Sequence, residues 1–85
     1  MSMDRASLQT SALDVLRSIA PELEPGAIEP SKPLRNQVDL DSMDWLNFLI
    51  GLHQRLGVNI PEADYAQLGT LDQVLDYLQA KLGPG

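Results

Sequence analysis

A proline-rich stretch between two helix-like segments is the feature that most constrains how this chain folds. Prolines stand at positions 21, 25, 30 and 33, with a glycine at 26. Proline lacks a backbone N–H and clashes with the preceding helical turn, so we expect no regular helix or central strand across this region. Ile28, Leu34, Val38 and Leu40 can anchor the stretch to a core. The pattern predicts a long, ordered loop packed on helices.

On either side of this loop, apolar residues recur at helical spacing. We expect a first helix over residues 4–20, a second from 41 or 42 to Gly57, a short third over 62–68, and a last one from Thr70 to residue 82. Asp41 suits the N-cap of the second helix, and Thr70 with Gln73 forms a capping box. The predicted fold is an all-α four-helix bundle: three main helices, a short third helix and a long first loop. It forms a single domain over 1–85, ordered from about 4 to 82, with a frayed tail at 83–85.

The composition argues against several classes of function. The 85 residues include 12 acidic and 6 basic side chains, a net charge of −6, and no cysteine. An acidic chain is poorly suited to nucleic acid or to an anionic membrane surface, and suits a basic protein partner better. The absence of cysteine excludes disulfides and thiol nucleophiles on the chain itself.

Neither a targeting signal nor a membrane segment is visible. Residues 1–5 are polar with no apolar run behind them, and the apolar cluster over residues 46–52 is too short to span a bilayer. We therefore expect a cytoplasmic monomer without membrane insertion.

No catalytic set assembles from these residues. His53 is the only histidine, so no histidine-based metal cluster can form. Ser42 and His53 lie on one predicted helix, about 16 Å apart, and cannot share a triad. The expectation is a protein that is not an enzyme and holds no metal.

Ser42 is the residue best placed for chemistry, at the end of the loop and the start of the second helix. A helix N-terminus favours a phosphate through its free N–H groups and its dipole. A serine carrying a phosphodiester would therefore be stabilised here. On local features alone, the alternative is that Ser42 simply caps the helix.

The wider pattern favours the modified serine. The stretch Val-Asp-Leu-Asp-Ser-Met-Asp-Trp-Leu over residues 38–46 resembles the attachment motif of acyl carrier proteins: an Asp-Ser pair, a large apolar residue and an acid. The Ile-Pro at residues 60–61 and the Tyr-Leu at 77–78 resemble later segments of that family. The resemblance covers about residues 8–82.

This resemblance implies that Ser42 carries a 4′-phosphopantetheine arm, transferred from coenzyme A by a phosphopantetheinyl transferase, with Asp41 and Met43 beside it. The arm would hold acyl groups as thioesters for acyl-loading and acyl-transferring enzymes of lipid or secondary-metabolite biosynthesis. Two alternatives stay open: an aminoacyl or peptidyl carrier, and an unmodified helical protein-interaction module.

The resemblance also implies a partner surface on the second helix, made of Asp44, Trp45, Leu46 and Ile50. The alternatives are that Trp45 packs on the long loop and that Leu46 and Ile50 belong to the core; Met43 is expected to be buried. Gly51 either leaves room for cargo or allows close helix packing.

Along the second helix the acids stop at Asp44. We therefore expect weak electrostatic docking along it and a specialised carrier with its own partners.

Overall fold

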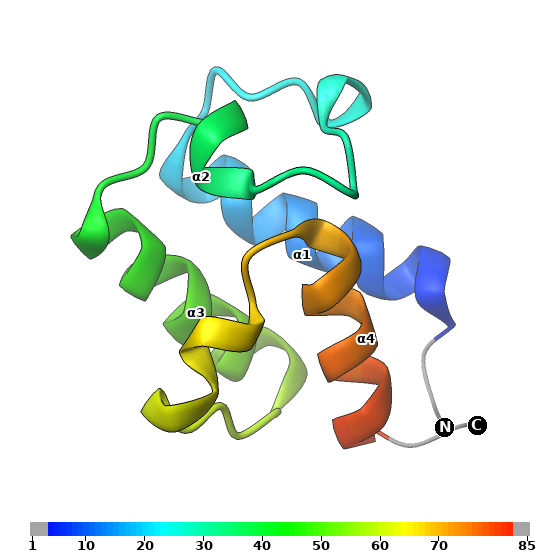
Figure 1. Ribbon diagram of the computed structural model, residues 1–85. Helices are drawn as coiled ribbons and strands as arrows, with labels where there is room; N and C mark the ends of the chain where they lie inside the picture. The colour runs from blue at the N-terminus through cyan, green and yellow to red at the C-terminus, as the bar shows by residue number, and fades with distance from the viewer. Residues whose placement is uncertain (1–3, 83–85) are drawn as a thin grey trace.

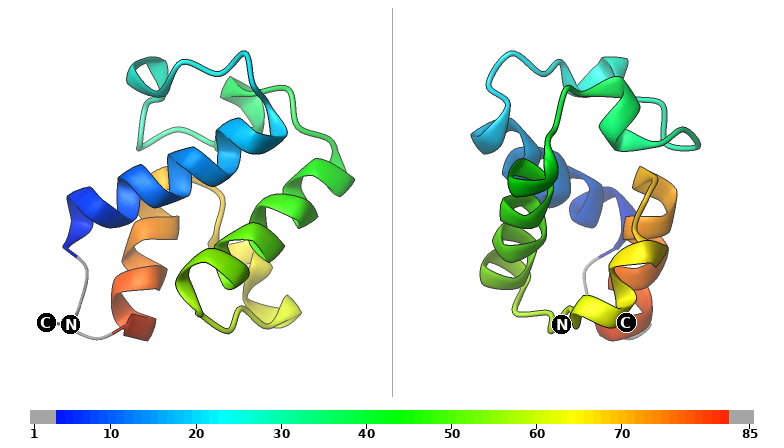
Figure 2. Two further views of the ribbon diagram at one scale, coloured as in Figure 1. Left: turned by 180° about the vertical axis from the view of Figure 1, so that it is seen from behind. Right: turned by 60° about the vertical axis from the view of Figure 1, so that its left-hand side comes forward.

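The computed structural model of the chain describes residues 4–82. The main helices are α1 (Arg5–Ile19), α3 (Ser42–Leu56) and α4 (Leu71–Leu82). Three short elements accompany them: the 3₁₀ turns η1 (Pro25–Ala27) and η2 (Glu62–Gln67), and the single helical turn α2 (Leu34–Gln37). The loop between α1 and α3 arches over one end of the bundle (Figures 1 and 2). The all-α prediction is confirmed, while the expected tail at 83–85 lies outside the described residues.

The helix ends follow the local sequence closely. The Gln73 N–H donates to the Thr70 hydroxyl and the Thr70 N–H to the Gln73 side-chain oxygen, both at 3.0 Å, so the predicted capping box is formed. Gly57 ends α3 with φ of 67°, a left-handed conformation that glycine adopts without strain. At the start of α1, the Asp4 carboxylate accepts a hydrogen bond of 2.8 Å from the Ser7 N–H.

The expectation that the proline-rich loop holds no helix was wrong in one place. Pro33 directly precedes α2, with φ of −56°. Proline is tolerated ahead of the first helical turn, where its missing N–H costs no hydrogen bond. The predicted short third helix is confirmed and takes the 3₁₀ form, as η2.

The loop is anchored to the start of α4. The Leu34 N–H donates to the Gly69 carbonyl oxygen at 2.9 Å, and the Asp72 N–H donates to that of Pro30 at 3.0 Å. Leu34, Val38 and Leu40 are buried. The segment is therefore an ordered part of the core, as the sequence predicted.

One hydrophobic core joins α1, α3 and α4. Its fully buried side chains include Leu8 and Leu16 of α1, Phe48, Leu49 and Leu52 of α3, and Val74, Leu75 and Leu78 of α4. Where α1 crosses α3, a Cβ added at Gly51 would lie only 2.5 Å from Cγ1 of Val15. Of the two interpretations of Gly51, the structure supports close helix packing.

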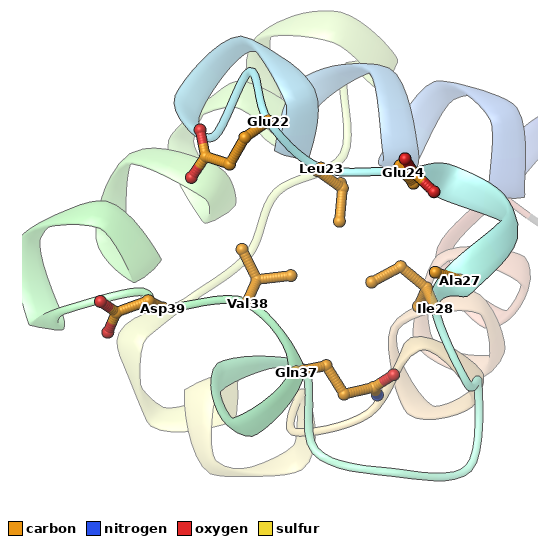
Figure 3. Close-up of a pocket in the computed structure, with 8 residues that line it drawn as sticks. All are labelled: Glu22, Leu23, Glu24, Ala27, Ile28, Gln37, Val38 and Asp39. Atoms are coloured by element: carbon orange, nitrogen blue, oxygen red, sulfur yellow. The ribbon is translucent and has the colours of Figure 1, made fainter.

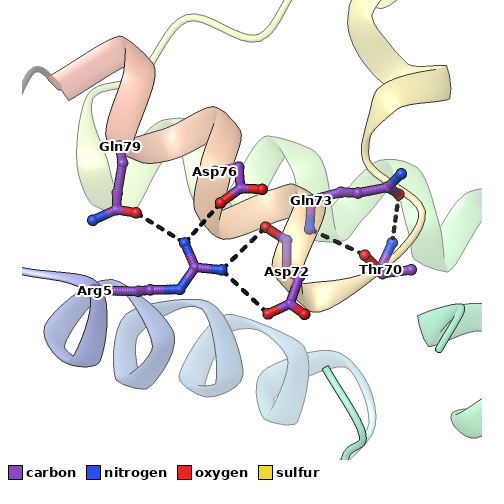
Figure 4. A network of polar contacts seen from close by, with 6 residues as sticks. All are labelled: Arg5, Thr70, Asp72, Gln73, Asp76 and Gln79. Carbon is purple, nitrogen blue, oxygen red and sulfur yellow. Dashed lines mark hydrogen bonds and ion pairs between the residues drawn. The ribbon is translucent and has the colours of Figure 1, made fainter. Parts of the chain in front are cut away.

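Polar contacts also join α1 to α4. The Arg5 guanidinium donates to Asp76 at 2.8 Å, to Gln79 at 2.9 Å and to Asp72 at 3.2 Å (Figure 4). These residues are partly exposed, so their ion pairs add little to the free energy of unfolding. The network mainly fixes how α1 lies against α4.

A second polar contact joins η2 to α4. The Tyr77 hydroxyl donates to Asp64 at 2.6 Å. Partial burial and the nearby carboxylate raise the pKa of Tyr77 to about 12, so this hydrogen bond persists through neutral pH.

We predict that Gly51→Ala destabilises the fold by about 1–3 kcal/mol, because the new methyl group overpacks the contact with Val15. This reverses the usual gain from replacing a helical glycine by alanine. Urea unfolding measures the effect. Combining Gly51→Ala with Val15→Ala should cost less than the sum of the two single changes. Gly26→Ala is the matched control, since no atom lies within 4 Å of its added Cβ. Equal effects at positions 26 and 51 would contradict the packing argument.

Candidate functional site

The predicted site lies where the long loop enters α3. Asp41 has extended backbone angles (φ −83°, ψ −178°), and its carboxylate accepts a hydrogen bond of 2.8 Å from the Asp44 N–H. Asp41 is thus the N-cap, as its sequence position predicted. The alternative that Ser42 itself caps the helix is wrong. Ser42 is the first residue of α3 and is exposed, and among residues 4–82 its hydroxyl has no hydrogen-bond partner.

The backbone around Ser42 suits an anion. The first N–H groups of a helix have no carbonyl oxygen one turn earlier to bind. Here the Asp44 N–H is taken by Asp41, and the Trp45 N–H binds the Asp41 carbonyl oxygen at 3.0 Å. Among residues 4–82 the N–H groups of Ser42 and Met43 have no acceptor, and they lie at the positive end of a helix of 15 residues. A phosphodiester on Ser42 would therefore fit this terminus.

Apolar side chains lie exposed beside Ser42 on α3. Met43 is 65%, Leu46 36% and Ile50 42% exposed. At about 100° of rotation per residue, Ser42 and these three residues occupy one sector roughly 100° wide. We call Met43, Leu46 and Ile50 the α3 stripe. It runs along the helix from the serine that the sequence singled out.

The expectation that Met43 is buried was wrong. Helical geometry places Met43 about 180° around α3 from Leu52, which is fully buried. Leu46 and Ile50 face outward, as the resemblance implied, and not into the core.

The other two predicted partner residues lie at the edge of this surface. Trp45 is half-buried, and its ring centroid lies 5.2 Å from that of Phe48 in the core. Trp45 therefore serves packing with part of its surface, and its role toward partners stays a prediction. Asp44 is half-buried in the first turn of α3, beside Asp41.

A groove continues from the far end of the α3 stripe toward η2. It has a volume of about 180 Å³ and is lined by Leu49, Ile50, His53, Asn59, Ile60 and Tyr65. The His53 Nδ1 lies 2.8 Å from the Val58 carbonyl oxygen, and this contact holds the linker that forms one wall. Sequence reasoning missed this groove, because nothing in the local pattern brings Tyr65 of η2 beside α3.

Within residues 4–82, no group of three or more histidine and acidic side chains is placed to hold a metal ion. In the same part of the chain, no helix is long and apolar enough to cross a membrane.

The family model described as the phosphopantetheine attachment site matches residues 12–78. The chain belongs to the acyl carrier protein family. Members of this family are carriers and not enzymes, and the matched domain implies a 4′-phosphopantetheine prosthetic group.

Individual relatives agree with this assignment. The meromycolate extension acyl carrier protein of Mycobacterium leprae is 33% identical over 57 residues, which cover 67% of this chain and 50% of the relative. The chain thus matches only about half the length of such curated relatives. The acyl carrier protein of Acidothermus cellulolyticus is 20% identical over 92% of each chain.

Solved structures support the fold. A solution structure from Anaplasma phagocytophilum, described as an acyl carrier protein, superposes with a TM-score of 0.83 at 19% identity and covers 100% of this chain and 99% of its own. The acyl carrier protein of Enterococcus faecalis gives a TM-score of 0.73 at 18% identity, covering 93% of this chain and 99% of its own. These values establish the acyl carrier fold, including its long first loop.

We predict that Asp41→Ala lowers the free energy of unfolding by about 1 kcal/mol, because α3 loses its N-cap, while Asp41→Asn keeps most of it. Ser42→Ala should stay within about 0.5 kcal/mol of the unchanged protein, because the hydroxyl caps nothing. Chemical denaturation of the three variants provides the comparison. A loss for Ser42→Ala as large as that for Asp41→Ala would mean that the serine shares the capping role.

Proposed function

We propose that Ser42 is the attachment point of the 4′-phosphopantetheine group. On this proposal the chain carries acyl groups as thioesters to enzymes of lipid or secondary-metabolite biosynthesis. The observation that supports it is the exposed Ser42 hydroxyl at the N-terminus of α3. It has no hydrogen-bond partner among residues 4–82, because Asp41 alone caps the helix. When bound, the group supplies the thiol that this cysteine-free chain lacks.

The loading step follows from the position of Ser42. With a phosphopantetheinyl transferase as partner, the Ser42 Oγ forms a bond to the pyrophosphate phosphorus of coenzyme A that carries the pantetheine. The pyrophosphate P–O bond breaks, and adenosine 3′,5′-bisphosphate leaves. The serine proton passes to a base of the transferase, because no basic side chain of this chain contacts the hydroxyl within residues 4–82. The N–H groups of Ser42 and Met43 then stabilise the phosphodiester.

The α3 stripe is the surface we assign to partner enzymes. Exposed apolar side chains bordered by polar residues are typical of protein contact sites. Because the stripe lies in one sector with Ser42, a partner bound to it has its active site near the arm. Asp44 and the free edge of Trp45 extend this surface.

We infer acyl cargo over aminoacyl cargo. Matched relatives from three mycobacterial species are named for meromycolate extension, and this supports a role in acyl-chain chemistry. The acid-poor α3 supports a specialised carrier with its own partner set.

The attachment is tested by intact mass after incubation with coenzyme A, Mg²⁺ and a broad-specificity phosphopantetheinyl transferase. The protein should gain the mass of one phosphopantetheine group, and Ser42→Ala should gain nothing. Ser31→Ala, another exposed serine, is the matched control and should be loaded like the unchanged protein. Absence of any gain with several transferases would favour the unmodified interaction module instead.

The α3 stripe is tested by the double variant Leu46→Asp and Ile50→Asp. We expect kcat/KM for loading by the transferase to fall about tenfold or more, because a docked partner would have to desolvate two carboxylates where it otherwise meets apolar side chains. The free energy of unfolding should change little, because both side chains are already exposed. Gln54→Asp, exposed on the same helix outside the sector, controls for the added charge. Unchanged loading of the double variant would remove the stripe from the transferase interface.

A further inference from the structure

A second pocket lies under the long loop, away from the α3 stripe. It has a volume of about 410 Å³ and is formed between residues 22–28 and residues 37–39. Leu23, Ile28 and Val38 point toward its centre and form an apolar floor (Figure 3). We call this the loop pocket. Its floor is continuous with the core, since Val38 is buried and Leu23 and Ile28 pack against it.

Three acidic residues stand at the edge of the apolar floor. Glu22, Glu24 and Asp39 line the pocket and are all exposed, and the carboxylates of Glu22 and Asp39 turn away from its centre (Figure 3). The ion pairs formed within residues 4–82 use other acids, so none of these three carboxylates is neutralised by a basic side chain there. The loop pocket therefore combines an apolar floor with an uncompensated negative rim.

The walls of the loop pocket are held in place before any partner arrives. The Gln37 side chain accepts from the Glu29 N–H at 2.6 Å and donates to the Glu29 carbonyl oxygen at 2.8 Å and to that of Lys32 at 2.9 Å. On the other wall, the Leu23 N–H donates to the Ala20 carbonyl oxygen at 3.0 Å. A preorganised site loses less conformational freedom when it binds.

The loop pocket is also close to the attachment point along the chain. Asp39 precedes Ser42 by three residues, so their Cα atoms lie within roughly 11 Å. Along α3 itself, the only carboxylate is Asp44, and Arg55 there is paired with Asp14. Acids without an ion pair in residues 4–82 thus lie near Ser42 on both sides, Asp39 on the loop and Asp44 in the first turn of α3.

We propose that the loop pocket binds an arginine side chain of a partner enzyme while that enzyme acts on the phosphopantetheine arm. This rests on the proposed carrier function, because it assumes an enzyme docked beside Ser42. An arginine has an apolar stem that fits the floor formed by Leu23, Ile28 and Val38. Its guanidinium ends in a planar set of donors that two carboxylates can share. An acyl chain fits less well, since it would cover charged carboxylates without pairing them.

The test uses the unmodified full chain and N-acetyl-arginine amide as the probe, followed by ¹H–¹⁵N NMR at low salt. We expect shifts confined to residues 22–28 and 37–39, with a Kd of order 1–10 mM for so small a ligand. The triple variant Glu22→Gln, Glu24→Gln, Asp39→Asn should bind about tenfold more weakly, and added salt should weaken binding to the unchanged protein. Its spectrum also reports whether the variant is folded.

Two controls isolate the arginine charge and the pocket. N-acetyl-citrulline amide has nearly the same shape without the charge, and it should bind at least fivefold more weakly. The variant Glu62→Gln neutralises an exposed acid elsewhere and should bind like the unchanged protein. Equal binding of citrulline, shifts spread over all acidic surfaces, or no shifts at all would each overturn the proposal. Because Ser42 stays unmodified throughout, these outcomes are independent of whether it accepts the arm.

Discussion

The close approach of α1 and α3 is the constraint on which the rest of the structure depends. Gly51 has no side chain, and Val15 fills the space that one would need. This contact sets the separation and the rotation of α3, so Phe48, Leu49 and Leu52 face inward. The same rotation turns the α3 stripe outward, into one sector with Ser42. A packing contact on one side of the helix thereby creates the surface on the other.

At the N-terminus of α3, capping and the proposed attachment fall on neighbouring residues. Asp41 satisfies the Asp44 N–H, and this leaves the Ser42 hydroxyl without a structural task. A serine acting as cap would have to give up that hydrogen bond when modified. The acyl carrier family to which the chain belongs needs no catalytic group of its own, and this arrangement provides only what a carrier requires: an accessible hydroxyl and a favourable place for a phosphate.

Several elements were predictable because their causes lie within a few residues of chain. The cap at Asp41 and the capping box at Thr70 each depend on a side chain and a backbone group three residues apart, and the left-handed conformation of Gly57 depends on its lack of a side chain. The resemblance of residues 38–46 to an attachment motif is local in the same way. Predictions failed where the cause was remote. The exposure of Met43 depends on which face of α3 meets α1, and α2 forms where the loop bonds to the start of α4.

By itself, the sequence determined the three main helices, their ends, the ordered loop between the first two, and the candidate attachment residue. These follow from apolar periodicity, prolines and short-range hydrogen bonds, which act within one segment. Only the tertiary structure decided which apolar residues of α3 remain exposed, where the groove beside η2 opens, and that Leu23, Ile28 and Val38 line one pocket together with three acidic residues. Surfaces and pockets require segments far apart in the chain to meet, and that meeting is governed by how the whole core packs.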